Sequence, residues 1–143
     1  MGWSDWYECS FDDKGELDIR PLVDKAPTSP GIYAIAMKDG YGYQVQYIGM
    51  STTNIYKRLR AHFTGRGNNY IKERLKQKKE QHRTMELVNA LYFMYLETSK
   101  EDTNWMESLY IRGTMPIANV QQRLSLPRPL QDLSSNFEVE RED

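Results

Sequence analysis

Two short triplets, one on each side of a turn, constrain the fold of this chain more than any other feature. Gly31-Ile32-Tyr33 and Tyr47-Ile48-Gly49 each combine a tyrosine and a glycine within a short β-favouring run. Between them lies Asp39-Gly40, a dipeptide suited to the positive φ angles of a tight turn. We therefore predict an antiparallel hairpin over residues 31–49 that brings two phenols to one small surface.

The aromatic residues of the second predicted strand follow a period of two. Tyr43, Val45 and Tyr47 occupy alternate positions. Because successive side chains of a regular strand point to opposite faces of a sheet, we expect both tyrosines on the same face.

The hairpin is followed by a segment with helical periodicity. Ile55, Leu59 and Phe63 are spaced at i, i+4 and i+8, which gives a helix over about 55–63 an apolar stripe. Asn54 stands immediately before it and is a good N-cap residue.

The elements after this helix are predicted from composition and capping residues. A loop over 64–68 leads to a very basic helix over 69–81. Residues 92–96 favour a strand, whereas 85–91 are compatible with a strand or a helix. A further helix is expected to begin at Asp102 or Thr103 and to run through Arg112.

Length and cysteine content bound the class of protein. At 143 residues the chain can form one domain with its own core, and it has no run near the roughly 18 apolar residues of a membrane span. The N-terminus lacks the basic start and apolar stretch of a secretory signal. Cys9 is the only cysteine, which excludes an intramolecular disulfide. We therefore expect an intracellular protein, in the cytoplasm or associated with the nucleoid or nucleus.

The basic charge of the chain is concentrated in one segment. The formal net charge is −1, but residues 57–83 hold ten Lys and Arg residues against two Glu residues, a local charge of +8. Such a run is often only the solvated face of a helix. Here it begins beside the second triplet, so it equally fits a surface that binds the phosphates of a nucleic acid.

Side chains suited to phosphodiester cleavage accompany the two triplet tyrosines. Arg58 and His62 are four residues apart and so share one face of the first helix, and Glu107 falls on a later helix. An arginine can neutralise charge that develops in the transition state, and a single carboxylate suits Mg²⁺. A tyrosine, with an ordinary pKa of about 10, can deprotonate water only if nearby positive charge favours its phenolate.

Together these segments resemble the GIY-YIG nuclease family. Four matching blocks occur in the family's order, and they are Pro30 to Tyr33, Tyr47 to Ser51, Lys57 to Phe63, and Trp105 to Glu107 followed by Pro116 and Asn119. Arg58 and His62 fall in register with the family's helix motif. The resemblance covers about residues 30–120, and four ordered blocks are far more specific than a lone Gly-Ile-Tyr.

This resemblance implies a small α/β (α+β) domain with a central three-stranded antiparallel sheet flanked by helices. It implies metal-dependent cleavage of DNA, with Mg²⁺ or Mn²⁺ as cofactor. Tyr33 would be the general base for water, Tyr47 would orient water or phosphate, and Arg58 would stabilise the transition state. His62 would bind phosphate or relay a proton, and Glu107 would hold the metal.

The resemblance also implies structural roles for three residues. Gly31 and Gly49 would allow close packing or bending of the strands, and Asn119 would brace the site.

We expect the basic segment to contact DNA phosphates through Arg60, Arg66, Lys72 and Arg74. Phosphate contacts alone give salt-sensitive binding with little sequence preference. Specificity would therefore come from the basic helix, from a homodimer or from a partner protein.

The chain is predicted to divide into three parts. Residues 1–29 form an N-terminal extension that packs on the domain as an edge strand or a covering flap, and residues 30–120 form the nuclease domain. Residues 121–143 form a C-terminal tail whose composition is typical of partial disorder.

Two other functions are compatible with the sequence. The first is a catalytically silent nucleic-acid-binding module of the same fold, which the complete set of proposed catalytic residues disfavours. The second is a protein-interaction domain, which leaves the basic segment and the motifs unexplained.

Overall fold

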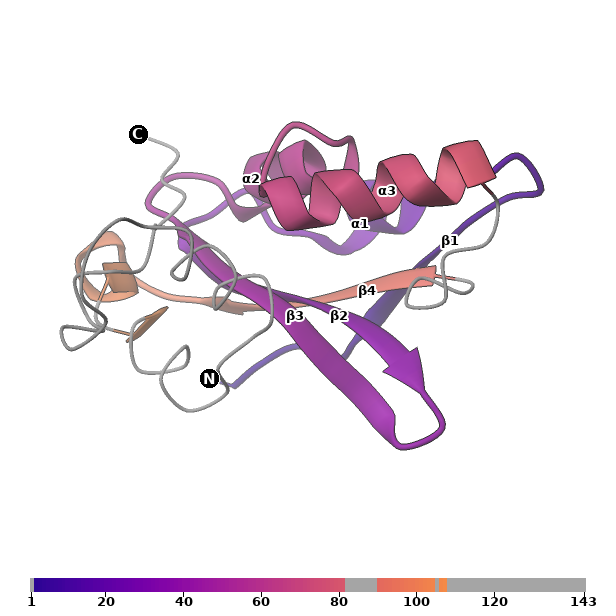
Figure 1. Ribbon diagram of the computed structural model, residues 1–143. Coiled ribbons are helices and arrows are strands. Elements are labelled where there is room, and N and C mark those ends of the chain that lie inside the picture. The colour runs from indigo at the N-terminus through magenta and orange to yellow at the C-terminus, as the bar shows by residue number, and fades with distance from the viewer. Residues whose placement is uncertain (1, 82–89, 105, 108–143) are drawn as a thin grey trace, which may run out of the picture.

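The computed structural model describes residues 2–81, 90–104 and 106–107, which form an antiparallel sheet with helices on one face (Figure 1). The elements in chain order are β1 (Tyr7–Ser10), α1 (Arg20–Lys25), β2 (Gly31–Asp39), β3 (Gly42–Ser51), α2 (Ile55–Phe63), α3 (Asn69–Gln81), β4 (Ala90–Glu97) and the short 3₁₀ helix η1 (Lys100–Asp102).

The sheet has the strand order β1-β4-β2-β3, and every neighbouring pair is antiparallel. The predicted α+β class and the antiparallel sheet flanked by helices are confirmed. The prediction of three strands is wrong, because the described residues form a four-stranded sheet. The additional strand, β1, comes from the N-terminal segment and pairs at the sheet edge with β4, Tyr7 opposite Phe93.

The hairpin of β2 and β3 is present, but its outer half does not follow a regular alternation. Ile35 pairs with Tyr47 and Ala36 with Val45, so Gln46 is an extra residue in β3. A bulge of this kind moves all side chains beyond it to the opposite face. Val45 accordingly packs away from Tyr47, and the prediction that Tyr43 and Tyr47 share one face is wrong.

The two helices predicted after the hairpin, α2 and α3, are present, and each begins directly after an asparagine that caps it. The Asn54 side chain accepts a hydrogen bond of 3.0 Å from the main-chain N–H of Lys57 and begins α2. The Asn68 side chain accepts from the N–H groups of Tyr70 and Ile71, at 2.9 and 3.2 Å, at the start of α3. None of the helices in the described ranges is long and apolar enough to cross a membrane.

The end of the described chain follows β4. Residues 103–104 and 106–107 are helical after η1, in agreement with the start of the predicted helix. The rest of that helix, Asn119 and the predicted tail at 121–143 lie outside the described residues.

Two apolar layers lie on the two faces of the sheet. The layer beneath the helices joins strand residues such as Ile35 and Phe93 to Leu59 of α2 and Ile71 of α3. On the other face smaller clusters of strand residues pack against the N-terminal segment that contains Trp3. Strand β2 lies between β4 and β3 and is buried from Gly31 to Met37, so side chains at its start are held on both sides.

Candidate active site

The two triplets meet at one end of the β2–β3 ladder. Tyr33 pairs with Gly49, and Tyr47 lies two residues before that glycine, on the face covered by the helices. The two phenol rings are fully buried, and their centroids are 6.3 Å apart. The structure therefore brings the two predicted catalytic tyrosines together.

Gly49 makes the space that the Tyr33 phenol occupies. A Cβ atom at position 49 would overlap the Tyr33 hydroxyl and ring, and would lie 2.8 Å from the ring of Tyr47. The glycine of the second triplet thus lets the first tyrosine lie across the neighbouring strand. Gly31 is also in close contact, since a Cβ there would overlap the main-chain oxygen of Leu96.

His62 is the third ring of this cluster. It projects from α2 towards the sheet and is fully buried, with its centroid 4.9 Å from that of Tyr47 and 5.5 Å from that of Tyr33. Its Nε2 atom is 2.8 Å from the Tyr33 hydroxyl oxygen, a hydrogen-bonding distance.

His62 is held neutral. Burial, with a smaller contribution from the positive charge of Arg58, lowers the pKa of His62 to about 3. Its Nδ1 atom accepts a hydrogen bond of 2.9 Å from the main-chain N–H of Asn68. Both ring nitrogens are therefore engaged inside the protein, an arrangement that does not favour direct binding of phosphate by His62.

Arg58 and Glu107 bring opposite charges to buried positions. Arg58 lies one turn before His62 on α2; its side chain is half-buried and its Nε atom is inaccessible to solvent. Glu107 is only 1% exposed and both of its carboxylate oxygens are buried. Because β4 ends opposite the start of β2, the segment that carries Glu107 leaves the sheet at the end where Tyr33 lies.

The residues present fit a divalent cation held by one protein carboxylate. Glu107 supplies a buried carboxylate, whereas the described ranges contain no group of three or more His, Cys, Asp or Glu residues that could enclose a metal. Mg²⁺ usually keeps several waters and needs few protein ligands beside a substrate phosphate. A buried carboxylate such as that of Glu107 is a ligand type that Mg²⁺ or Mn²⁺ accepts.

The residues expected to bind DNA phosphates differ in their exposure to solvent. Arg60, Arg66 and Lys72 are exposed. Arg74 is half-buried: its guanidinium lies 4.9 Å from the ring centre of Tyr70 and donates to Gln77 at 3.0 Å.

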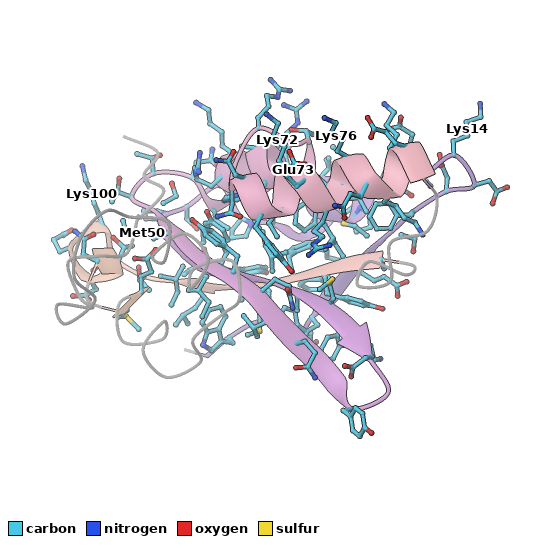
Figure 2. The ribbon with its side chains drawn as sticks, in the orientation of Figure 1. Lys14, Met50, Lys72, Glu73, Lys76 and Lys100 are labelled. Atoms are coloured by element: carbon cyan, nitrogen blue, oxygen red, sulfur yellow. The ribbon has the colours of Figure 1, made fainter. Side chains whose placement is uncertain are left out.

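The exposed lysines of α3 form a basic surface, and of these lysines the sequence predicts only Lys72 as a site residue. Lys72 and Lys76 project from α3 away from the sheet (Figure 2). With Lys79 they line a pocket of about 430 Å³ that is also lined by Phe63. Lys76 was not predicted as a site residue; its spacing of four from Lys72 is the signal that could have indicated it.

The loop between α2 and α3 was predicted only as a connection, yet it contacts the site. Asn68 donates to His62, and a Cβ at Gly67 would overlap the His62 ring. No charged or nucleophilic side chain marks this contact in the sequence, because the Asn68 group that makes it is the main chain.

The model of the GIY-YIG catalytic domain matches residues 29–112, more than half of the chain. The chain belongs to the GIY-YIG family. No curated protein and no solved structure gave a significant match. The GIY-YIG match spans both triplets, helices α2 and α3, and Glu107. It therefore includes every described residue of the candidate site.

Replacing Gly49 with alanine is expected to destabilise the protein by about 1–3 kcal/mol, because the added methyl overlaps Tyr33 and forces it to shift. The free energy of unfolding in urea measures this. Gly40→Ala is the matched control, since a Cβ there meets nothing within 4 Å. Equal stability of the two variants would contradict the close packing of Tyr33 over Gly49.

Stability is expected to depend on pH through His62. The folded protein keeps His62 neutral down to a pKa of about 3, whereas the unfolded chain takes up a proton near 6.5, so the unfolded state binds more protons between these values. The stabilisation is complete above 6.5 and is lost as the pH falls towards 3. In this window the wild-type free energy of unfolding should fall more steeply than that of His62→Leu, by about 1.4 kcal/mol per pH unit. Parallel pH dependences would show that His62 does not contribute.

Proposed function

We propose that this GIY-YIG protein is a metal-dependent DNA endonuclease that hydrolyses phosphodiester bonds with water activated by Tyr33. The observation that carries the proposal is the buried contact of Tyr33, Tyr47 and His62 over Gly49. The family assignment supports nuclease chemistry in general. The rings are fixed by main-chain register and by packing, which is the preorganisation that a catalytic group needs.

Tyr33 is the proposed base. In its phenolate form it would take a proton from water as the water oxygen attacks phosphorus and the bond to the leaving oxygen breaks. Tyr47 would orient the water or the phosphate, and His62 would hold the Tyr33 oxygen through the 2.8 Å hydrogen bond. Arg58 would compensate the negative charge that grows on the phosphoryl oxygens.

Glu107 would hold Mg²⁺ or Mn²⁺. The bound ion would supply Lewis-acid stabilisation of the phosphoryl oxygens. Because Glu107 and Tyr33 are both buried, access of a phosphate to them requires the groups that cover the site to move when DNA binds.

The exposed cations of the loop and of α3 would bind the DNA backbone. Arg66, Lys72 and Lys76 are accessible to solvent, as phosphate-binding groups must be. Such contacts position DNA without reading its sequence, so a homodimer or a partner protein would supply specificity.

A second candidate is a nucleic-acid-binding module that does not cleave DNA. The complete burial of Tyr33 favours it, since a fully buried base cannot reach a substrate in the conformation described. The two candidates predict the same DNA binding and opposite outcomes for cleavage.

Tyr33→Phe is expected to reduce the nicking of supercoiled plasmid in Mg²⁺ by about 100-fold or more, because it removes the proposed base. Glu107→Gln should have a comparable effect, and EDTA should abolish wild-type cleavage. Tyr41→Phe is the matched control, because the same atom is removed from a side chain that is 96% exposed.

Binding of the same DNA is measured in EDTA for each variant. Cleavage by both site variants at the wild-type rate would contradict the proposed mechanism. DNA binding without cleavage by the wild type, in Mg²⁺ and in Mn²⁺, would support the non-catalytic alternative.

A further inference from the structure

The loop between α2 and α3 contacts His62 on the side of the ring away from Tyr33. The main-chain N–H of Asn68 is 2.9 Å from Nδ1, and Gly67 lies so close to the ring that a Cβ would overlap it. These two residues have no role in the function proposed above. Their contact nevertheless determines which way the hydrogen bond to Tyr33 points.

A main-chain N–H can only donate a hydrogen bond, so Nδ1 of His62 must be the acceptor and must lack a proton. An imidazolium carries a proton on both nitrogens and could not accept this bond. The ring is therefore neutral with its one proton on Nε2. Since Nε2 is 2.8 Å from the Tyr33 oxygen, His62 donates and Tyr33 accepts.

We propose that Asn68 is a positioning residue, whose main-chain N–H fixes His62 as the Nε2–H tautomer and makes it a hydrogen-bond donor to the Tyr33 oxygen. This inference deepens the proposed function and rests on it for its consequence in cleavage. In this tautomer His62 stabilises negative charge on the Tyr33 oxygen, the form that can accept a proton from water. His62 does not take up the Tyr33 proton, because its acceptor nitrogen faces Asn68.

Other titratable and charged groups face the same ring. Tyr47 of β3 packs at a centroid distance of 4.9 Å, and Arg58 of α2 acts on His62 through its positive charge. A positive charge disfavours a second proton on the ring, so Arg58 supports the neutral state that the Asn68 contact requires.

The side chain of Asn68 does not make the hydrogen bond to His62 and instead caps α3. Its amide oxygen accepts from the N–H groups of Tyr70 and Ile71 and caps α3, and its main-chain oxygen accepts from Lys72 at 2.9 Å. One residue thus joins the first turn of the basic helix to the Tyr33–His62 pair.

This division of tasks allows a matched set of substitutions at position 68. Asn68→Asp keeps both the N–H and a capping oxygen. Asn68→Ala loses the cap and keeps the N–H, whereas Asn68→Pro loses both. The comparison of alanine with proline therefore isolates the main-chain N–H.

The tautomer is measured by ¹⁵N NMR of histidine-labelled protein, in which the shifts and couplings of the two ring nitrogens distinguish Nε2–H, Nδ1–H and imidazolium. The chain has two histidines, and His62→Leu assigns the signal of His62. We expect the Nε2–H form in the wild type at neutral pH and in Asn68→Asp and Asn68→Ala. Asn68→Pro should populate the Nδ1–H form as well.

Gly67→Ala provides a second route that leaves Asn68 in place. Its methyl would push the loop away from the ring, and it should also admit the Nδ1–H form. If Asn68→Pro does not fold, the spectra of the wild type and of Gly67→Ala decide the question. A wild-type Nδ1–H tautomer, or an unchanged Nε2–H tautomer in every folded variant that loses the contact, would overturn the inference.

Single-turnover nicking at saturating DNA adds the functional consequence. Asn68→Pro should cleave on the order of tenfold more slowly than Asn68→Ala, with equal DNA binding. Equal cleavage rates despite a changed tautomer would overturn the role of the tautomer in catalysis. If the wild type shows the Nε2–H form and cleaves no DNA, the proposed function fails and the structural part of the inference stands.

Discussion

The hydrogen bond of 2.8 Å between the Tyr33 hydroxyl and His62 Nε2 connects the sheet to α2 at a position that water does not reach. In such surroundings a hydrogen bond is stronger than in water, and an unpaired partner is costly. The elements around it are arranged accordingly: β2 presents Tyr33, α2 presents His62, and the loop after α2 supplies the second partner of the ring.

Two glycines make this contact possible by leaving space for rings. Gly49 accommodates the Tyr33 phenol from the neighbouring strand, and Gly67 accommodates His62 from the loop. A side chain at either position would separate groups that now lie within hydrogen-bonding distance. The glycine of the second triplet is thus explained by packing against the tyrosine of the first.

Sequence reasoning succeeded where one local signal determined one element. The apolar stripe and the Asn54 cap predicted α2, and two β-favouring runs on either side of a turn signal predicted the hairpin. The predicted positive φ at Gly40 is wrong, because the glycine of this turn with a positive φ is Gly42. It was wrong about Tyr43, because a single extra residue in β3 changes the face of every side chain beyond it and has no compositional signature.

The sequence also left two tertiary features undetermined. Strand β1 depends on pairing with β4, 80 to 86 residues later, so its short sequence could equally have formed a covering flap. The contribution of Asn68 to the site is made by its main chain, which every residue except proline shares. The triplets predicted that Tyr33 and Tyr47 meet. They did not predict that the main-chain N–H of Asn68 holds the ring of His62 beside them.

The hydrogen bond between Tyr33 and His62 should couple the two side chains energetically, and a double-mutant cycle measures that coupling directly. The free energies of unfolding in urea at neutral pH are determined for the wild type, Tyr33→Phe, His62→Leu and the double variant. We expect a favourable coupling energy of about 1 kcal/mol or more, as is typical of a buried hydrogen bond. Additive effects of the two substitutions, with a coupling energy near zero, would contradict it.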